Sequence, residues 1–253
     1  MSNIYFLVKT FSFLLMTMSL LSCMSASPKY SDRDQAVNEL ISTSLRNIET
    51  GNLQLARHTI EQALAINNQH LNGNNIAGLI YGKLNEDTLA KHHFSAALNI
   101  SKNDPATLNN YANYLCENND KSKAIELFLQ AASNINNPQR EIAYINAGLC
   151  SLRIPDTPNA KNYFLLALEV QPQNNIALYQ LAKIYYLNEQ GNTAHRYLTE
   201  YSQIAQHTPD TLKLGIQISR LNKTKKLENS YINILSSRFP ESAQLIWAVA
   251  TQK

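Results

Sequence analysis

A packing stripe recurs along most of this chain at intervals of 34 residues. Each stripe places an alanine, a larger apolar residue four positions later and another apolar residue three positions after that, all on one helical face. The stripes are Ala56/Ile60/Ala63, Ala90/Phe94/Ala97, Ala124/Phe128/Ala131, Ala160/Phe164/Ala167 and Ala194/Leu198/Tyr201. One interval measures 36 residues instead of 34. This phased repetition predicts an all-α solenoid built from similar units.

A second helical stretch precedes each stripe and carries a small residue in the same phase. These small residues are Gly78, Ala112, Gly148 and Ala182, and they allow the two helices of a unit to approach closely. A helix pair that repeats every 34 residues, with this order of small and aromatic positions, resembles the tetratricopeptide repeat. The resemblance implies a right-handed superhelix in which the first helices of the units line the concave face.

Prolines and glycines set the predicted unit boundaries. Pro105, Pro138, Pro172, Pro209 and Pro240 fall near boundaries, where a proline starts or stops a helix at little cost. Gly51 and Gly191 fall between the two helices of their units. The predicted units span 37–70, 71–104, 105–140, 141–174 and 175–208, followed by a degraded sixth unit, 209–242, and a capping helix with the C-terminus, 243–253. The sixth unit is considered degraded because Glu228 replaces the expected alanine, and the two-residue excess at Gln139–Arg140 lengthens one loop.

The amino-terminal segment has the parts of an export signal. Lys9 precedes an apolar run that ends in Leu20-Leu21-Ser22-Cys23, which resembles a lipoprotein processing site. The resemblance implies a signal peptide at 1–22, acyl chains on Cys23 and a lipidated linker at 23–36. The residue after Cys23 is Met24 and not an aspartate, which in many such lipoproteins causes retention in the inner membrane. The resemblance therefore points to the periplasmic face of the outer membrane. The alternative is ordinary cleavage after Ser25-Ala26-Ser27, which would discard Cys23.

Two further cysteines lie 34 residues apart. Cys116 is in the predicted first helix of the third unit and Cys150 in that of the fourth, so stacking could bring them together. In an oxidising compartment an even pair is a candidate disulfide that would tie adjacent units. The alternative is two buried free thiols that pack as small hydrophobic residues.

The segments around these cysteines carry a second resemblance. Asn110–Cys116 reads NYANYLC and Asn146–Cys150 reads NAGLC, which resembles the cysteine-bearing segments of the PilF/PilW type IV pilus biogenesis and stability lipoproteins. Those segments typically read NYGxFLC and NxGxC, so Ala112 replaces a glycine and Tyr114 a phenylalanine. The family implies a pilotin-like role in targeting, assembly or stability of the pilus secretin, and so in pilus biogenesis.

Signatures of catalysis are missing from the sequence. The histidines form no HExxH pair, and His58 and His92 are expected on a solvated outer face. The chain has no glycine-rich phosphate loop and no GxSxG elbow. Asp104, Asp156 and Asp210 are expected in turns or at helix N-termini. We therefore expect no enzyme, cofactor, metal or small-molecule substrate.

The charge of the chain gives no support for nucleic-acid binding. The formal net charge is +3, and the only basic cluster, Lys223, Lys225 and Lys226, is expected to be a solvated corner.

The resemblance also indicates where a partner segment would bind. In tetratricopeptide proteins, positions 2, 5, 9, 12 and 13 of each first helix usually face the groove. The predicted partner-binding residues are Asn38, Ile41, Leu45, Ile48, Asn75 and Leu79. Apolar groups would supply affinity and the asparagines would fix a peptide backbone. The alternative is that Ile41 and Leu45 pack against neighbouring segments. A second stretch, Ile176, Tyr179, Lys183 and Tyr186, is either core or contact surface.

Two non-catalytic functions follow from these expectations. The first is a lipid-anchored factor that binds the pilus secretin. The second is a general envelope scaffold lipoprotein that serves outer-membrane protein assembly or peptidoglycan enzymes.

Overall fold

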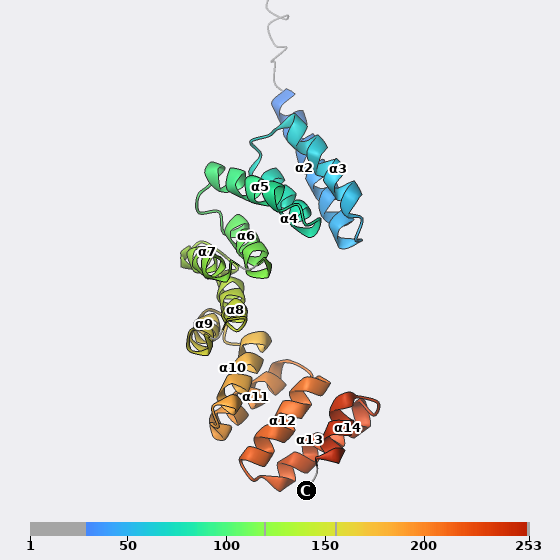
Figure 1. Cartoon of the computed structure of the whole chain (residues 1–253), viewed down its shortest axis with the longest axis vertical. Helices are drawn as coiled ribbons and strands as arrows, with labels where there is room; N and C mark the ends of the chain where they lie inside the picture. The colour runs from blue at the N-terminus through green and yellow to red at the C-terminus, as the bar shows by residue number, and fades with distance from the viewer. Residues whose placement is uncertain (1–28, 119, 155, 252–253) are drawn as a thin grey trace, which may run out of the picture.

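The computed structural model of the protein describes residues 29–118, 120–154 and 156–251, which form thirteen α-helices joined by short turns (Figure 1). The helices are α2 (Lys29–Glu49), α3 (Leu53–Ile66), α4 (Leu71–Lys83), α5 (Asp87–Ile100), α6 (Pro105–Glu117), α7 (Lys121–Ser133), α8 (Arg140–Ser151), α9 (Thr157–Val170), α10 (Asn175–Leu187), α11 (Gly191–Ile204), α12 (Pro209–Leu221), α13 (Lys225–Arg238) and α14 (Ala243–Ala250). Helices α2 to α13 pack as six consecutive pairs, and α14 follows the last pair. The predicted all-α architecture of helix-turn-helix units with a terminal helix is confirmed.

The repeated stripe of each second helix lies inside its helix pair. Ala90, Phe94 and Ala97 are fully buried in α5, and the same positions are buried in α3, α7, α9 and α11. Full burial of one such phenylalanine removes enough apolar surface from water to contribute about 2 kcal/mol. The stripe therefore contributes substantially to the stability of each of these units.

The small residues of the first helices meet the large residues of the stripe. A Cβ atom added to Gly78 would lie 2.7 Å from Cδ1 of Phe94, and one added to Gly148 would lie 2.7 Å from Cε1 of Phe164. Real Cβ atoms do not approach so closely. Glycine at these positions lets the backbone of the first helix rest directly on the aromatic ring of the second.

In four units the structure describes one residue with a left-handed backbone in the turn between the two helices. These residues are Gly51 (φ 76°), Asn85 (φ 61°), Glu189 (φ 58°) and Lys223 (φ 57°), all in the same phase of the repeat. The corresponding residues of the other two units, 119 and 155, lie outside the described part of the chain. Gly191, which we expected between the helices, instead begins α11. A side chain there would collide with the carboxamide of Asn222, so close packing rather than the turn requires the glycine.

The first helix begins earlier than the sequence predicts. The expected linker covered residues 23–36, whereas α2 already begins at Lys29. Residues 29–36 contain no glycine or proline to interrupt a helix, so the helix of the first unit continues backward through them. Cys23, the predicted lipidation site, lies outside the described residues.

The sixth unit is a complete helix pair that departs from the repeat most visibly at Glu228. This glutamate is 4% exposed and accepts a hydrogen bond from Nε of Arg220 at 2.8 Å, while Nζ of Lys225 lies 3.1 Å from its other oxygen. Arg220 also donates to the carbonyl oxygen of Ala248 and to Oγ1 of Thr251. Glu228 thus positions an arginine that holds the end of α14.

The six pairs stack into a curved row that runs from α2 to α14 (Figure 1). First helices pack against first helices: α2 on α4, α4 on α6, α6 on α8, and α10 on α12. In Figure 1, α4, α6 and α8 lie on the inner side of the curve and α5, α7 and α9 on the outer side. In this middle part of the row the first helices α4, α6 and α8 therefore form the inner face, and α2 continues their row of contacts by packing on α4. None of the helices described between Lys29 and Ala250 is long and apolar enough to span a membrane.

Candidate functional site

The amino-terminal end of the inner face offers fewer free apolar side chains than the sequence predicts. Leu45 is 39% exposed and Asn38 is also exposed, but Ile41 is buried. Ile48 and Leu79 are half-buried and pack against the core. The side chains at 41, 48 and 79 thus contribute mainly to packing between helices. Leu45 is the predicted apolar groove residue with the largest accessible surface.

Asn38 lies in a polar stripe along α2. It lines a shallow hollow of about 780 Å³ whose other residues all come from the same helix, among them Asp34, Ser42 and Arg46. The polar composition of this face suits the solvated end of a solenoid. Asn38 and Leu45 lie on one face of α2, two helical turns apart.

Asparagines form bridges between successive first helices. Nδ2 of Asn110 in α6 donates to Oδ1 of Asn75 in α4 at 3.1 Å, and Nδ2 of Asn146 in α8 donates to Oδ1 of Asn109 in α6 at 3.0 Å. Asn75 is buried, so this predicted binding residue holds two units in register. Position and residue type alone did not distinguish this role from partner binding, because the bonding partner comes from the neighbouring unit.

Asn109 and Asn110 also line a hollow of about 460 Å³ between the amino-terminal ends of α6 and α8. Its other walls include Gln139 and Ile142, next to the predicted two-residue excess. The buried side chain of Asn137, just before the two-residue excess, lies at the edge of this hollow. Its Nδ2 donates a hydrogen bond to the carbonyl oxygen of Ala131. The hollow presents amides and one half-exposed isoleucine to solvent.

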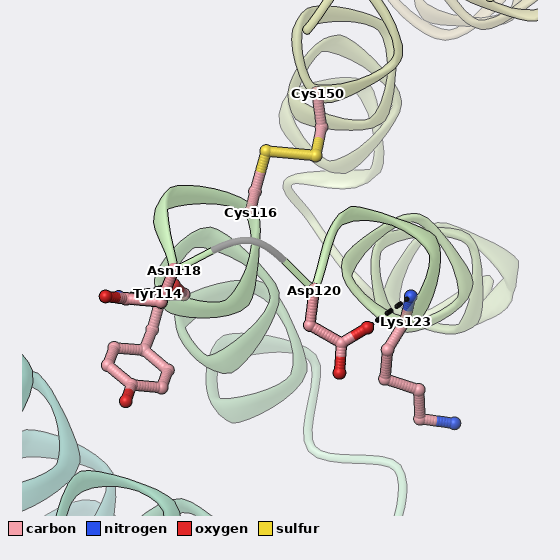
Figure 2. Close-up of a disulfide and its surroundings, with 6 residues drawn as sticks. All are labelled: Tyr114, Cys116, Asn118, Asp120, Lys123 and Cys150. Carbon is pink, nitrogen blue, oxygen red and sulfur yellow. Dashed lines mark hydrogen bonds between the residues drawn. A yellow bond between two sulfur atoms is a disulfide. The ribbon is translucent and has the colours of Figure 1, made fainter. Parts of the chain in front are cut away.

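The two cysteines are joined in the structure. The Cys116–Cys150 disulfide links α6 to α8, with Cα atoms 6.0 Å apart, as Figure 2 shows. Both cysteines line a small hollow of about 90 Å³, together with Asn113, Asn146 and Leu149. The covalent link and the bond between Asn109 and Asn146 both fix α6 against α8. Disulfides persist in oxidising compartments, so this pair indicates an extracytoplasmic protein.

The helix that carries Cys116 ends in a turn with its own stabilising contacts. Tyr114 reaches toward the preceding unit, where its hydroxyl donates to Oδ1 of Asp87 at 2.9 Å. Burial, followed by this carboxylate, raises the pKa of Tyr114 to about 12, so the hydroxyl remains a donor at neutral pH. After the turn, Oδ1 of Asp120 accepts a hydrogen bond from the backbone N–H of Lys123 (Figure 2). These contacts fix the end of α6 and the start of α7 next to the disulfide.

The carboxy-terminal half of the inner face is aromatic and basic. Tyr179, Lys183 and Tyr186 of α10 line a hollow of about 260 Å³ with Lys213 and Gln217 of α12. Ile176, in the first turn of α10, is also exposed. Burial, with the carboxylate of Asp210 as a smaller cause, raises the pKa of Tyr179, so its hydroxyl stays protonated. The α10 residues are the second stretch noted in the sequence, and they belong to the surface.

Sequence reasoning missed the α12 side of this hollow. Lys213 and Gln217 occupy positions 5 and 9 of the sixth unit, and Asp210 occupies position 2. The same counting that identified Tyr179 and Lys183 would have found them. The sixth unit departs from the repeat at Glu228 and so was predicted to be degraded, but its first helix still presents these positions to the hollow.

The residues expected to serve structure do so. Asp104 and Asp156 are N-caps, where Oδ2 of Asp104 accepts from the backbone N–H of Thr107 at 2.8 Å. Asp210 lies in the first turn of α12. His58 and His92 are exposed. Among the described residues no group of three or more histidine, cysteine or acidic side chains could hold a metal ion.

Both the sequence and the fold of this chain resemble those of known proteins. No family profile matches the sequence. The type IV pilus assembly protein PilF of Pseudomonas aeruginosa is 24% identical over 212 residues, which covers 84% of each chain. A solved structure of Pseudomonas aeruginosa PilF covers 87% of this chain and 100% of its own, with a TM-score of 0.75 and 24% identity.

Two other solved structures share the fold. PilW, described as a widely conserved type IV pilus biogenesis factor, is 26% identical and matches with a TM-score of 0.72, covering 85% of this chain and 99% of its own. The C-terminal part of a tetratricopeptide-repeat protein from Cytophaga hutchinsonii matches with a TM-score of 0.66 at 14% identity, covering 87% of this chain and 96% of its own. Of these three structures, the two pilus proteins share the higher sequence identity with this chain. The chain is thus similar in sequence and fold to the type IV pilus proteins PilF and PilW over more than four-fifths of its length, and it has the tetratricopeptide-repeat fold.

Proposed function

We propose that this protein is an outer-membrane lipoprotein that binds the type IV pilus secretin and assists its targeting, assembly or stability, and so supports pilus biogenesis. The observation that supports this most strongly is similarity over more than four-fifths of the chain to two type IV pilus proteins. The inner face supplies a surface of the right kind, because solenoid grooves recognise extended or helical protein segments. The secretin segment would lie along the first helices of the units.

Leu45 is the residue through which the amino-terminal part of this face would contact the secretin. Its side chain is exposed two helical turns along α2 from the Asn38 amide, and the apolar group would supply affinity while the amide pairs with the backbone of the segment. The disulfide and the asparagine bridges would keep the surface in one shape, which lowers the entropy lost on binding.

Copurification of the secretin with the lipidated protein tests this function. Leu45→Glu places a charge on the inner face without disturbing the core, so we expect much less secretin to copurify. Leu55→Glu is the matched control, because Leu55 is an exposed leucine of α3, the second helix of the same unit. Equal recovery of secretin with both variants would show that this face does not bind it.

Anchoring at Cys23 is the second part of the proposal. Several acyl chains would hold the protein stably on the bilayer, since each buried methylene contributes about 0.8 kcal/mol. Cys23→Ala should leave the fold intact, as judged by circular dichroism of the purified protein, but should release it from the outer-membrane fraction. A variant that still fractionates with the outer membrane would exclude this anchor.

A further inference from the structure

The hollow between α10 and α12 has the position of a ligand site. Tyr179, Lys183 and Tyr186 occupy groove positions 5, 9 and 12 of the fifth unit, and Lys213 and Gln217 occupy positions 5 and 9 of the sixth. The two helices pack against each other, so the residues of both units form one surface. The wall that faces the core is Leu214, which is buried.

Positive charge exceeds negative charge in this hollow. Its ionisable side chains besides the tyrosines are Lys183, Lys213 and Asp210. Asp210 accepts a hydrogen bond from Nε2 of Gln244 at 2.9 Å. Neither lysine forms a salt bridge with any residue between Lys29 and Thr251 that the structure describes, and Lys213 rests with Nζ 4.8 Å from the centre of the Trp247 ring. Both ammonium groups are available to a carboxylate from outside.

Apolar and aromatic surface surrounds these charges. Leu187, the last residue of α10, is 64% exposed, and the half-buried rings of Tyr179 and Tyr186 lie on the same side of the hollow. Exposed leucine and tyrosine side chains beside cations suit a segment that alternates apolar and acidic residues. A volume of about 260 Å³ accommodates one large side chain together with the backbone next to it.

We propose that this hollow is a separate binding site for a short acidic protein segment. Carboxylates of the segment pair with Lys183 and Lys213, and an apolar side chain between them rests on Leu187 and Tyr186. The Gln217 amide hydrogen-bonds the segment's backbone. The site lies four units away from Leu45, so it does not depend on what the amino-terminal part of the inner face binds.

Fluorescence anisotropy of a labelled peptide tests this site on the full-length protein in detergent. The probe is a fluorescein-labelled peptide that alternates aspartate and leucine, and the reference peptide carries asparagine in place of each aspartate. We expect the acidic peptide to bind at least tenfold more tightly. The protein has a single tryptophan, so a change in Trp247 emission on binding reports that the ammonium group of Lys213 has moved toward the peptide.

Charge-removal variants distinguish this site from general attraction. Lys183→Gln and Lys213→Gln should each weaken binding of the acidic peptide about five- to tenfold, the range expected when one charge-assisted hydrogen bond is lost. Lys226→Gln removes the same charge from an exposed position of α13 and should leave affinity unchanged.

Three results would overturn the proposal. Equal affinity for the acidic and the asparagine peptide would show that Lys183 and Lys213 do not recognise carboxylates. An equal loss of affinity in the Lys226→Gln control would show that the acidic peptide responds only to the net charge of the protein. Stoichiometric displacement of the peptide by oligothymidylate would assign the hollow to nucleic acid instead of protein.

Discussion

At the scale of single residues, the left-handed residue in the turn lets the chain reverse direction between the two helices of a unit. Glycine occupies it in the first unit and asparagine in the second, and both tolerate this backbone conformation. Glu189 and Lys223 occupy it in the fifth and sixth units, where a side chain costs about 1 kcal/mol. The turns of the fifth and sixth units therefore carry a backbone strain that the glycine of the first unit avoids.

Exchanging residues at this position should change stability in opposite directions. Glu189→Gly relieves the penalty and should raise the free energy of unfolding by about 0.5 to 1 kcal/mol, less than the full penalty because glycine also loosens the unfolded chain. Gly51→Ala should lower it by about 1 kcal/mol. A Cβ at Gly51 meets no atom within 4 Å, so the loss comes only from the backbone. Urea unfolding measures both changes, and a Glu189→Gly protein less stable than wild type would contradict this explanation.

At the scale of helices, the Glu228–Arg220 pair connects α12, α13 and α14. The hydrogen bond from Arg220 lowers the pKa of Glu228 below its ordinary value, against the opposing effect of burial. Arg220 lies with its guanidinium carbon 5.1 Å from the centre of the Trp247 ring, so it contacts α14 from two sides. Loss of the glutamate would leave this arginine without its carboxylate.

Restoring the alanine of the repeat at this position should destabilise the protein. Glu228→Ala should lower the free energy of unfolding by about 2 kcal/mol at neutral pH, because a charge-assisted bond is lost and a half-buried arginine is left unpaired. The depressed pKa means that this contribution is complete above about pH 4.5 and disappears as pH falls through the folded-state pKa. The difference between wild type and variant, measured by urea unfolding, should therefore shrink on acidification. A variant as stable as wild type at neutral pH would show that alanine suffices there.

The disulfide acts between helices of adjacent units. It closes a loop with a sequence separation of 34 residues between α6 and α8. In the chain-entropy picture a loop of this size stabilises the folded state by roughly 3 to 4 kcal/mol. The bond also lies where two clusters of buried side chains meet, because Cys150 belongs to the amino-terminal cluster and Ile145 of the same helix to the carboxy-terminal one.

Removing the bond should lower stability without changing the helices. Cys116→Ser, Cys150→Ser and the double variant should each lose roughly 3 to 4 kcal/mol in urea unfolding, and wild type under reducing conditions should lose a similar amount. Far-ultraviolet circular dichroism should remain that of a helical protein. If the double variant lost much more than reduced wild type, packing of the sulfur atoms rather than the covalent link would be the source of stability.

At the scale of the whole molecule, periodicity made the fold predictable. The stripe and the small residues opposite it, such as Phe94 and Gly78, identify both helices of a unit and their contact, and the phase brought Cys116 and Cys150 to neighbouring helices. Features that depend on one neighbour were not predictable in this way. Asn75 is buried because Asn110 of the next unit bonds to it, and Glu228 departs from the repeat because Arg220 needs a carboxylate.

The candidate site was predicted less completely than the fold. Counting positions located the inner face, but it could not separate side chains that reach solvent, such as Leu45, from those that pack between helices, such as Ile41. That distinction depends on how closely successive first helices approach. The carboxy-terminal hollow requires two units in contact, so Lys213 becomes part of a site only when α12 is packed against α10.

Under the proposed function, this protein serves secretin assembly through its inner face. The amount of secretin multimer can be measured in outer membranes of a strain from which the gene is deleted and which is complemented with wild type or with Leu45→Glu. We predict few multimers and no surface pili after deletion, recovery with wild type, and little recovery with Leu45→Glu. Normal multimers and normal twitching in the deletion strain would contradict the claim, and general envelope defects without loss of pili would assign the protein to envelope assembly instead.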